Sequence, residues 1–78
     1  MSRYHFDIHT DKEVYEDFYG ENLPNLDSAE SVARRSIAEI IAEQLHGKSS
    51  PVDWSMHIRD GEGRTILTLA FIDVLKSP

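Results

Sequence analysis

The sequence predicts an α+β domain in the order ββαββ, in which one helix covers one face of a four-stranded, mainly antiparallel sheet. Two observations predict this class. Apolar and polar residues alternate on either side of a central segment, whereas the central segment repeats its apolar residues every three or four positions. The first pattern is typical of half-buried strands and the second of an amphipathic helix. At 78 residues the chain has room for one domain, residues 1–78.

Two strands are predicted before the helix. Residues 3–9 alternate strictly, with Tyr4, Phe6 and Ile8 facing one way and polar residues facing the other. Residues 14–19 form a weaker strand that carries acidic residues. Because charge on an edge strand discourages pairing with another chain, we expect this strand at the edge of the sheet.

The helix is expected over residues 27–46. Pro24 holds the residue before it extended, so the helix cannot begin earlier. Asp27, with Glu30 three positions later, has the chemistry of an N-terminal capping box. Gly47 can supply the left-handed backbone that often follows a last turn. The expected apolar stripe consists of Ala29, Val32, Ala33, Ile37, Ile40, Ile41 and Leu45.

Two further strands are predicted over residues 53–59 and 65–72. Both faces of the last strand are substantially apolar, which indicates a central strand or a covered second face. Its outward apolar residues, Ile66, Ala70 and Ile72, form our candidate interface, because an exposed apolar stripe is a liability on a small monomer. The alternatives are a strand that tolerates these residues, or a C-terminal segment that folds over them.

Composition and charge narrow the classes of function. The chain carries 14 Asp and Glu against 8 Lys and Arg, a formal net charge of −6. Because phosphates attract cationic surfaces, we expect no nucleic-acid partner and no membrane partner, and a basic protein is the favoured kind of partner. The absence of cysteine excludes disulfides and thiolate chemistry. No segment approaches the ~20 apolar residues of a membrane span, and no export signal is visible, so we expect a cytoplasmic protein.

The chemically richest group lies on the polar face of the first predicted strand. His5, Asp7 and His9 are spaced two residues apart, so their side chains share one face with a repeat of roughly 6.6–6.8 Å. Two imidazoles and a carboxylate suit Zn²⁺ or Mn²⁺, and His57 could join them if the first and third strands are neighbours. The alternative is a solvated strand face, which requires polar residues at these positions anyway.

Acidic residues also crowd the first predicted hairpin and its exit. Their spacing does not match a calcium-binding helix–loop–helix motif. An acidic docking surface and a charged edge that resists aggregation remain as interpretations. The residues are Asp11, Glu13, Glu16, Asp17 and Glu21.

Three motifs run through almost the whole chain: Arg3-Tyr4-x-Phe6-x-x-His9, Gly20-x-x-Leu23-Pro24-x-Leu26-x-x-Ala29 and Asp60-x-x-Gly63-x-x-x-Leu67-x-x-x-Phe71. Together they resemble a family of short, uncharacterised proteins known mostly from alphaproteobacteria, which is a domain of unknown function. The resemblance supports the predicted fold boundaries and implies no mechanism. Phe18-Tyr19 stands where that family is expected to have more polar residues.

A second resemblance covers residues 3–46. Their strand–strand–loop–helix order, with Leu23-Pro24-x-Leu26 before the helix, is similar to the N-terminal domain of HicB-type antitoxins. Those proteins bind a small basic toxin, which implies a basic partner for this acidic chain. The Gly-rich loop that precedes the helix in that family is missing here.

No Ser, Thr or Cys stands in a context typical of a catalytic nucleophile, so we expect no enzyme, no catalytic residue and no cofactor. The function we expect is a protein-interaction domain that self-associates as a homodimer, or an antitoxin-like binder of a basic protein. The alternative is a metal-binding protein or metal-dependent hydrolase that uses the histidines.

Overall fold

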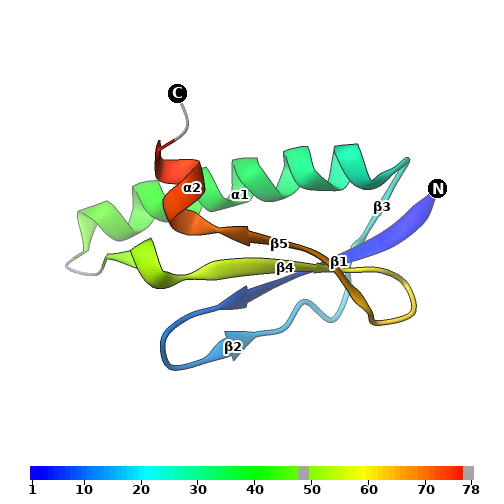
Figure 1. The fold of residues 1–78 in the computed structure, drawn as a ribbon, viewed down its shortest axis with the longest axis horizontal. Coiled ribbons are helices and arrows are strands. Elements are labelled where there is room, and N and C mark those ends of the chain that lie inside the picture. The colour runs from blue at the N-terminus through cyan, green and yellow to red at the C-terminus, as the bar shows by residue number, and fades with distance from the viewer. Residues whose placement is uncertain (48–49, 77–78) are drawn as a thin grey trace.

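The computed structural model describes residues 1–47 and 50–76. It is an open, five-stranded antiparallel sheet with one long helix, α1 (Leu26–His46), packed on its inner face (Figure 1). This arrangement confirms the predicted α+β class. The predicted count of four strands is wrong, because the segment opposite the first strand is divided into two short strands.

The sheet is built around β1 (Ser2–His9). On one side β1 pairs with β4 (Ser55–Arg59), which in turn pairs with β5 (Thr65–Ala70). On its other side β1 pairs with both β2 (Val14–Tyr15) and β3 (Glu21–Leu23). All of these pairings are antiparallel, so β2 and β3 share one edge of the sheet and β5 forms the other.

Residues 16–20, which we call the bulge loop, separate β2 from β3. Ile8 lies opposite Tyr15 and Tyr4 lies opposite Glu21, so three residues of β1 face five residues of the opposing segment. The two additional residues have no partners in the strand ladder, so the segment bulges away from β1. The continuous strand that we predicted over residues 14–19 is therefore wrong beyond β2.

α1 begins one residue before its predicted start. Its N-cap is Asn25, whose side-chain oxygen accepts a hydrogen bond from the Ser28 N–H at 2.9 Å. Asp27, which we predicted as the cap, lies instead in the first turn, where a carboxylate interacts favourably with the helix dipole. Gly47 ends the helix with a φ of −89°, so the left-handed backbone expected there does not occur.

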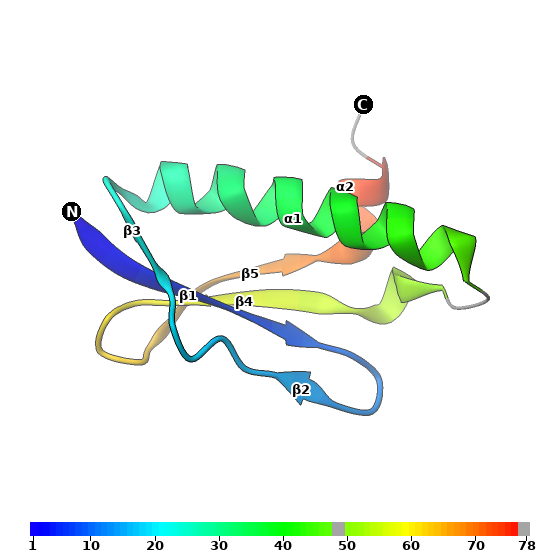
Figure 2. The ribbon, with the colours of Figure 1, turned by 180° about the vertical axis from the view of Figure 1, so that it is seen from behind.

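The hydrophobic core lies between α1, the inner face of the sheet and the C-terminal helix. Phe6, Ile8, Leu67 and Trp54 are half-buried around it. Figures 1 and 2 both show β2 at the edge of the sheet that is remote from α1. The buried residues are Tyr4, Ala29, Ala33, Ile37, Ile41, Met56, Ile58, Leu69 and Phe71.

The last predicted strand ends two residues early, because the chain turns into α2 (Phe71–Lys76). Phe71 is fully buried, and its N–H donates to the carbonyl of Trp54 at 3.0 Å. The two rings pack edge to face, with centroids 5.8 Å apart. Ile72 therefore lies on a helix, and not on the strand face that it was predicted to share with Ile66.

A short 3₁₀ helix, η1 (Pro51–Asp53), precedes β4, so the third predicted strand begins later than residue 53. Among the described residues, no helix is long and apolar enough to cross a membrane.

Candidate functional site

The outer face of the sheet, opposite α1, holds a buried ion pair between Asp7 on β1 and Arg59 on β4. Asp7 is 5% exposed. Arg59 Nε donates to one carboxylate oxygen at 2.5 Å, and Nη2 donates to the other at 3.1 Å. The strand register explains the contact: Asp7 lies opposite His57, and Arg59 is two residues further along the same face of β4.

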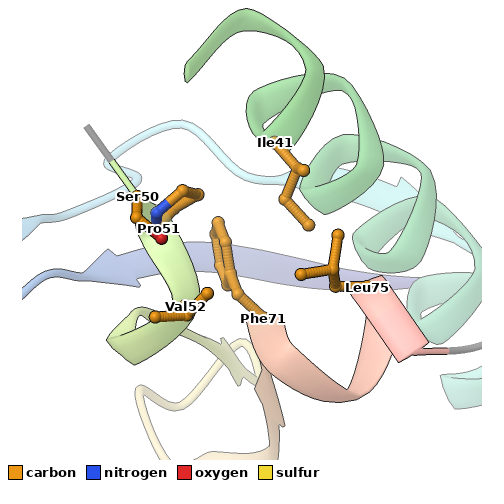
Figure 3. Close-up of a pocket in the computed structure, with 6 residues that line it drawn as sticks. All are labelled: Ile41, Ser50, Pro51, Val52, Phe71 and Leu75. Carbon is orange, nitrogen blue, oxygen red and sulfur yellow. The ribbon is translucent and has the colours of Figure 1, made fainter. Parts of the chain in front are cut away.

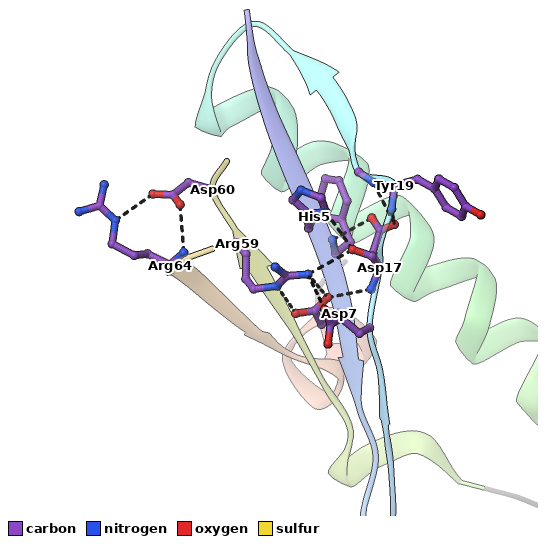
Figure 4. Close-up of polar contacts among 10 residues, drawn as sticks. His5, Asp7, Asp17, Tyr19, Arg59, Asp60 and Arg64 are labelled. Carbon is purple, nitrogen blue, oxygen red and sulfur yellow. Dashed lines mark hydrogen bonds and ion pairs between the residues drawn. The ribbon is translucent and has the colours of Figure 1, made fainter. Parts of the chain in front are cut away.

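This ion pair holds the backbone of the bulge loop at Asp17. The Asp17 N–H donates to Asp7 at 2.9 Å, and Arg59 Nη2 donates to the Asp17 carbonyl at 3.1 Å. His5 Nδ1 lies 2.8 Å from the same carbonyl oxygen, which can only accept, so Nδ1 carries the proton. Figure 4 shows these groups converging on the outer face.

The side chain of Asp17 replaces the strand ladder that the bulge interrupts. Its carboxylate accepts the Phe6 N–H at 3.1 Å, which a regular strand partner would otherwise accept with a backbone carbonyl. It also accepts the N–H groups of Tyr19 at 3.2 Å and Gly20 at 3.1 Å. Asp17 thus receives or donates six hydrogen bonds and belongs to the framework, whereas we had grouped it with the exposed acidic residues.

The charge states of this network follow from its contacts. Burial raises the pKa of the Asp7 carboxyl, but hydrogen bonds from Arg59 and the Asp17 backbone outweigh it and hold this pKa below its usual 3.8. Burial likewise raises the pKa of Asp17, and N–H donors led by Gly20 bring it below the usual value. The hydrogen bond to Asp7 raises the pKa of Arg59. All three groups are therefore charged at neutral pH.

Two histidines stack beside this network. The rings of His9 and His57 lie 3.7 Å apart between centroids, inclined by 21°. Burial lowers the pKa of His57, and the nearby His9 lowers it further. The Ser55 hydroxyl lies 3.2 Å from His57 Nε2.

The predicted metal ligands thus share the outer face. β1 and β4 are neighbours, which was the condition for His57 to join the residues of β1. Their contacts differ from those of a metal site. Asp7 is engaged by Arg59 and His5 by Asp17, while the His9 ring faces that of His57. In the part of the chain that the structure describes, no group of three or more His, Cys, Asp or Glu is placed to hold a metal ion.

The bulge loop and β2 carry large side chains into solvent. Phe18 is 76% exposed, Tyr19 is 85% exposed and Tyr15 is 56% exposed. In Figure 4 the Tyr19 ring points away from the buried network that fixes its backbone. We call Tyr15, Phe18 and Tyr19 the aromatic surface.

The sequence interpretation missed this surface. It treated residues 14–19 as a strand, which would have half-buried their apolar side chains. The available signal was the pair Phe18-Tyr19 directly before Gly20, in an otherwise acidic segment. Two consecutive large aromatic residues cannot both face one side of a strand.

Exposed carboxylates border the aromatic surface. Glu13, Glu16 and Glu21 are all exposed, and a hydrogen bond to Glu13 raises the pKa of Tyr15. Glu16 lies 3.7 Å from Arg59 Nη2 but keeps half of its side-chain surface in solvent. Four of the five acidic residues predicted as a docking surface are therefore available, the exception being Asp17.

The three residues of the predicted apolar interface, Ile66, Ala70 and Ile72, lie in different local structures. The β4–β5 register passes from Ile58 opposite Leu67 to Arg59 opposite Thr65, which makes Ile66 the extra residue of a β-bulge. Ile66 is 39% exposed. Ala70 is half-buried opposite Ser55, and Ile72 lies on α2, so the three residues do not form one continuous row.

A small apolar pocket of about 40 Å³ lies between α1, η1 and α2 (Figure 3). It has room for only a few water-sized groups. Its lining offers no charged side chain to orient a ligand. The lining residues are Ile41, Ser50, Pro51, Val52, Phe71 and Leu75.

A wider hollow of about 390 Å³ lies where the start of β1 meets the β4–β5 turn. Its charged side chains are already engaged: Arg3 donates to the Tyr19 carbonyl, and Asp60 and Glu62 pair with Arg64.

The fold and the outer-face network define a small α+β domain that holds one exposed aromatic loop in a fixed conformation. The chain belongs to the DUF6894 family, a domain of unknown function, whose model matches residues 3–72. This match confirms the resemblance to a domain of unknown function. No curated protein and no solved structure matches the chain.

Proposed function

We propose that this protein is a small protein-interaction domain that binds its partner through the aromatic surface. One observation carries the proposal: Phe18 and Tyr19 are largely exposed, although they follow Asp17, whose backbone is held by the buried ion pair and whose carboxylate accepts the Tyr19 N–H. Exposed apolar groups of this size lower solubility and do not contribute to the core. Their display on a rigid support is explained if they are buried by a partner.

The arrangement suits tight binding for two physical reasons. Burying a large apolar side chain contributes roughly 1.5–3 kcal/mol, and aromatic residues are frequent among the residues that dominate binding energy. A loop that is already ordered also loses little conformational entropy when the partner arrives. The contacts of Asp17 supply this order.

The proposal is tested with the double variant Phe18→Ser/Tyr19→Ser. Wild-type protein and variant are used to capture partners from the native host, with Arg35→Ser on the exposed face of α1 as the matched control. We expect a partner that binds wild type and the control but not the double variant, with similar melting temperatures for all three. A partner that binds the double variant equally well would contradict the proposal.

A second candidate function is self-association through β5. In the described part of the chain no strand pairs with the free edge of β5, and the six residues of β5 carry no charge and no proline to discourage pairing. An antiparallel pair of β5 strands would join two sheets into one homodimer, with the two-fold axis near the middle of the paired edge, beside Thr68. The bulge at Ile66 and the start of α2 restrict the regular edge to residues 67–70.

Sedimentation equilibrium separates this second function from the first. A homodimer would give a mass near twice 8.9 kDa, and Thr68→Lys should restore the monomer mass without loss of fold. A wild-type protein that remains monomeric at high concentration would contradict the proposed homodimer.

A more specific form of the first proposal makes the protein an antitoxin-like binder of a small basic protein. The net charge of −6 and the exposed acidic residues around the bulge loop support a basic partner. A small basic protein encoded beside this gene should form a stable complex on co-expression. If the two proteins fail to copurify, the antitoxin-like proposal is wrong, whereas the more general proposal of a protein-interaction domain is unaffected.

A further inference from the structure

We propose that the aromatic surface recognises arginine side chains in an exposed basic segment of the partner. This inference rests on the proposed function and names the chemistry of its ligand. Tyr15, Phe18 and Tyr19 supply exposed ring faces, and Glu13 and Glu16 supply exposed carboxylates on the same short stretch of chain. A guanidinium group can stack on an aromatic ring and pair with a carboxylate at the same time.

The charge around the loop supports a cationic ligand. Residues 11–21 contain five acidic side chains and one lysine. The two arginines that reach this region are already engaged: Arg3 donates to the Tyr19 carbonyl, and Arg59 pairs with Asp7 and lies 3.7 Å from the half-exposed Glu16 carboxylate. Among the described residues, neither arginine pairs with Glu13 or Glu21; both carboxylates are exposed, and Glu13 has a hydrogen bond with Tyr15.

Other occupants fit this surface less well. A purely apolar partner would cover the carboxylates without offering them hydrogen bonds, which costs free energy. A second copy packed loop to loop would bring two sets of acidic side chains together, and like charges across an interface are strongly unfavourable. Lysine can approach the same carboxylates, but its compact ammonium lacks the planar group that stacks on Phe18 and forms paired hydrogen bonds.

The β2 edge leaves space for such a segment. In Figures 1 and 2, β2 and the bulge loop lie along the edge of the sheet that is remote from α1. The Tyr19 ring also points away from the sheet (Figure 4). Because these rings and the glutamates beside them in the sequence are exposed, an arginine of an extended segment can approach them from solvent.

The test uses a short, flexible peptide with arginines separated by glycine and serine. It is titrated into isotopically labelled protein while amide chemical shifts are followed by NMR. We expect saturable shifts centred on residues 13–21, and affinity about tenfold weaker in Phe18→Ser/Tyr19→Ser. The same peptide with citrulline in place of arginine keeps the shape but loses the charge, and should also bind about tenfold more weakly.

Matched variants separate specific recognition from general attraction to an acidic protein. Glu13→Gln/Glu16→Gln should weaken binding of the arginine peptide, whereas Glu39→Gln/Glu43→Gln on the exposed face of α1 removes the same charge and should not. Equal binding of the citrulline peptide, or shifts centred on α1, would overturn the inference. So would a lysine peptide that binds as tightly as the arginine peptide.

The outcomes also distinguish the inference from the function on which it rests. If a host partner is captured in a manner that depends on Phe18 and Tyr19, but the arginine peptide does not bind, the proposed function stands and the arginine inference is wrong. If neither the peptide nor any loop-dependent partner binds, both are wrong.

Discussion

Asp7 and Arg59 are 52 residues apart in the chain and meet only because β1 and β4 are neighbours. The same carboxylate accepts the backbone N–H of Asp17, so one side chain joins three separate segments. Each partner is partly removed from water, and the pair is favourable only as long as both members are present. The energetic consequence of losing one member therefore exceeds that of losing an ordinary surface ion pair.

We predict that Asp7→Asn lowers the free energy of unfolding by about 3 kcal/mol, the lower end of the range for a broken buried pair, because the Arg59 side chain is 19% exposed. Urea denaturation measures this change. The matched control Glu16→Gln removes the exposed carboxylate 3.7 Å from the same guanidinium and should cost less than about 1 kcal/mol. Equal losses in the two variants would show that burial of the pair does not matter.

His57 gives the protein a pH dependence of known sign. Its pKa in the folded protein lies below the usual 6.5, through burial and the nearby His9. As the pH falls through 6.5, the unfolded chain therefore binds a proton before the folded protein does, and stability is lost. Above 6.5 this loss is absent. Asp7 and Asp17, with pKa values lowered from 3.8, lose their contribution only in more acidic solution.

We therefore predict that the unfolding free energy declines between about pH 7 and pH 5 in wild type, and that His57→Gln removes most of this decline. Thermal melts across this window measure the effect. A wild-type profile that is flat from pH 7 to about pH 5 would contradict the assignment.

At the scale of elements, the bulge loop depends on its closing glycine. Gly20 has a φ of +70°, and a Cβ added there would lie 2.8 Å from the Tyr4 carbonyl oxygen, a backbone atom of β1 that cannot move aside. Gly63 in the β4–β5 turn has a similar φ of +87° but nothing within 4 Å of an added Cβ. Both glycines therefore adopt a positive φ, but only Gly20 lacks room for an added Cβ atom.

We predict that Gly63→Ala costs about 1–2 kcal/mol, from left-handed strain alone, and that Gly20→Ala costs at least about 1 kcal/mol more. Denaturant titration of both variants gives the difference. If the two substitutions were equally destabilising, the close approach of the loop to β1 would have no energetic weight.

The same scale shows what the sequence could predict. α1 was predictable to within one residue at its start, because its apolar period and Pro24 are local signals, although the capping residue is Asn25 and not the predicted Asp27. The bulge loop was not, because the group that replaces its strand ladder is the side chain of Asp17, bonded to Phe6 eleven residues away. Local alternation cannot reveal such a contact.

On the outer face of the sheet, too, the sequence predicted the local arrangement but not the long-range contacts. Alternation correctly placed His5, Asp7 and His9 on one face of β1. Whether these groups bind a metal or pair with each other depends on strand register, which the sequence alone did not provide. The register brings Arg59 to Asp7, and the ion pair follows.

At the scale of the whole molecule, α2 closes one end of the core through Phe71. This residue is fully buried and packs edge to face against Trp54. It also lines the pocket shown in Figure 3. The last strand could not be separated from this helix by pattern, because Phe71 continues the apolar alternation of β5. A domain of this size has only about 4–12 kcal/mol of stability in total, so one such residue matters.

We predict that Phe71→Ala lowers the unfolding free energy by about 3–5 kcal/mol and leaves part of the population unfolded at room temperature. Leu75→Ala on the same helix, where the side chain is 49% exposed, should cost about 1 kcal/mol or less. Circular dichroism melts compare the two. A small effect of Phe71→Ala would mean that α2 contributes little to the core.

The attachment of the bulge loop has a consequence for how the protein can change over evolutionary time. The hydrogen bonds that hold the loop come from Asp7, Arg59 and His5 on the sheet and from the Asp17 carboxylate, and they engage only backbone atoms at Tyr19 and Gly20. Mutations at positions 18 and 19 should therefore change the exposed side chains of the proposed binding surface while leaving the bonds that hold the loop in place. For the same reason, these two positions are a suitable place to randomise the chain when new binders are selected from a library.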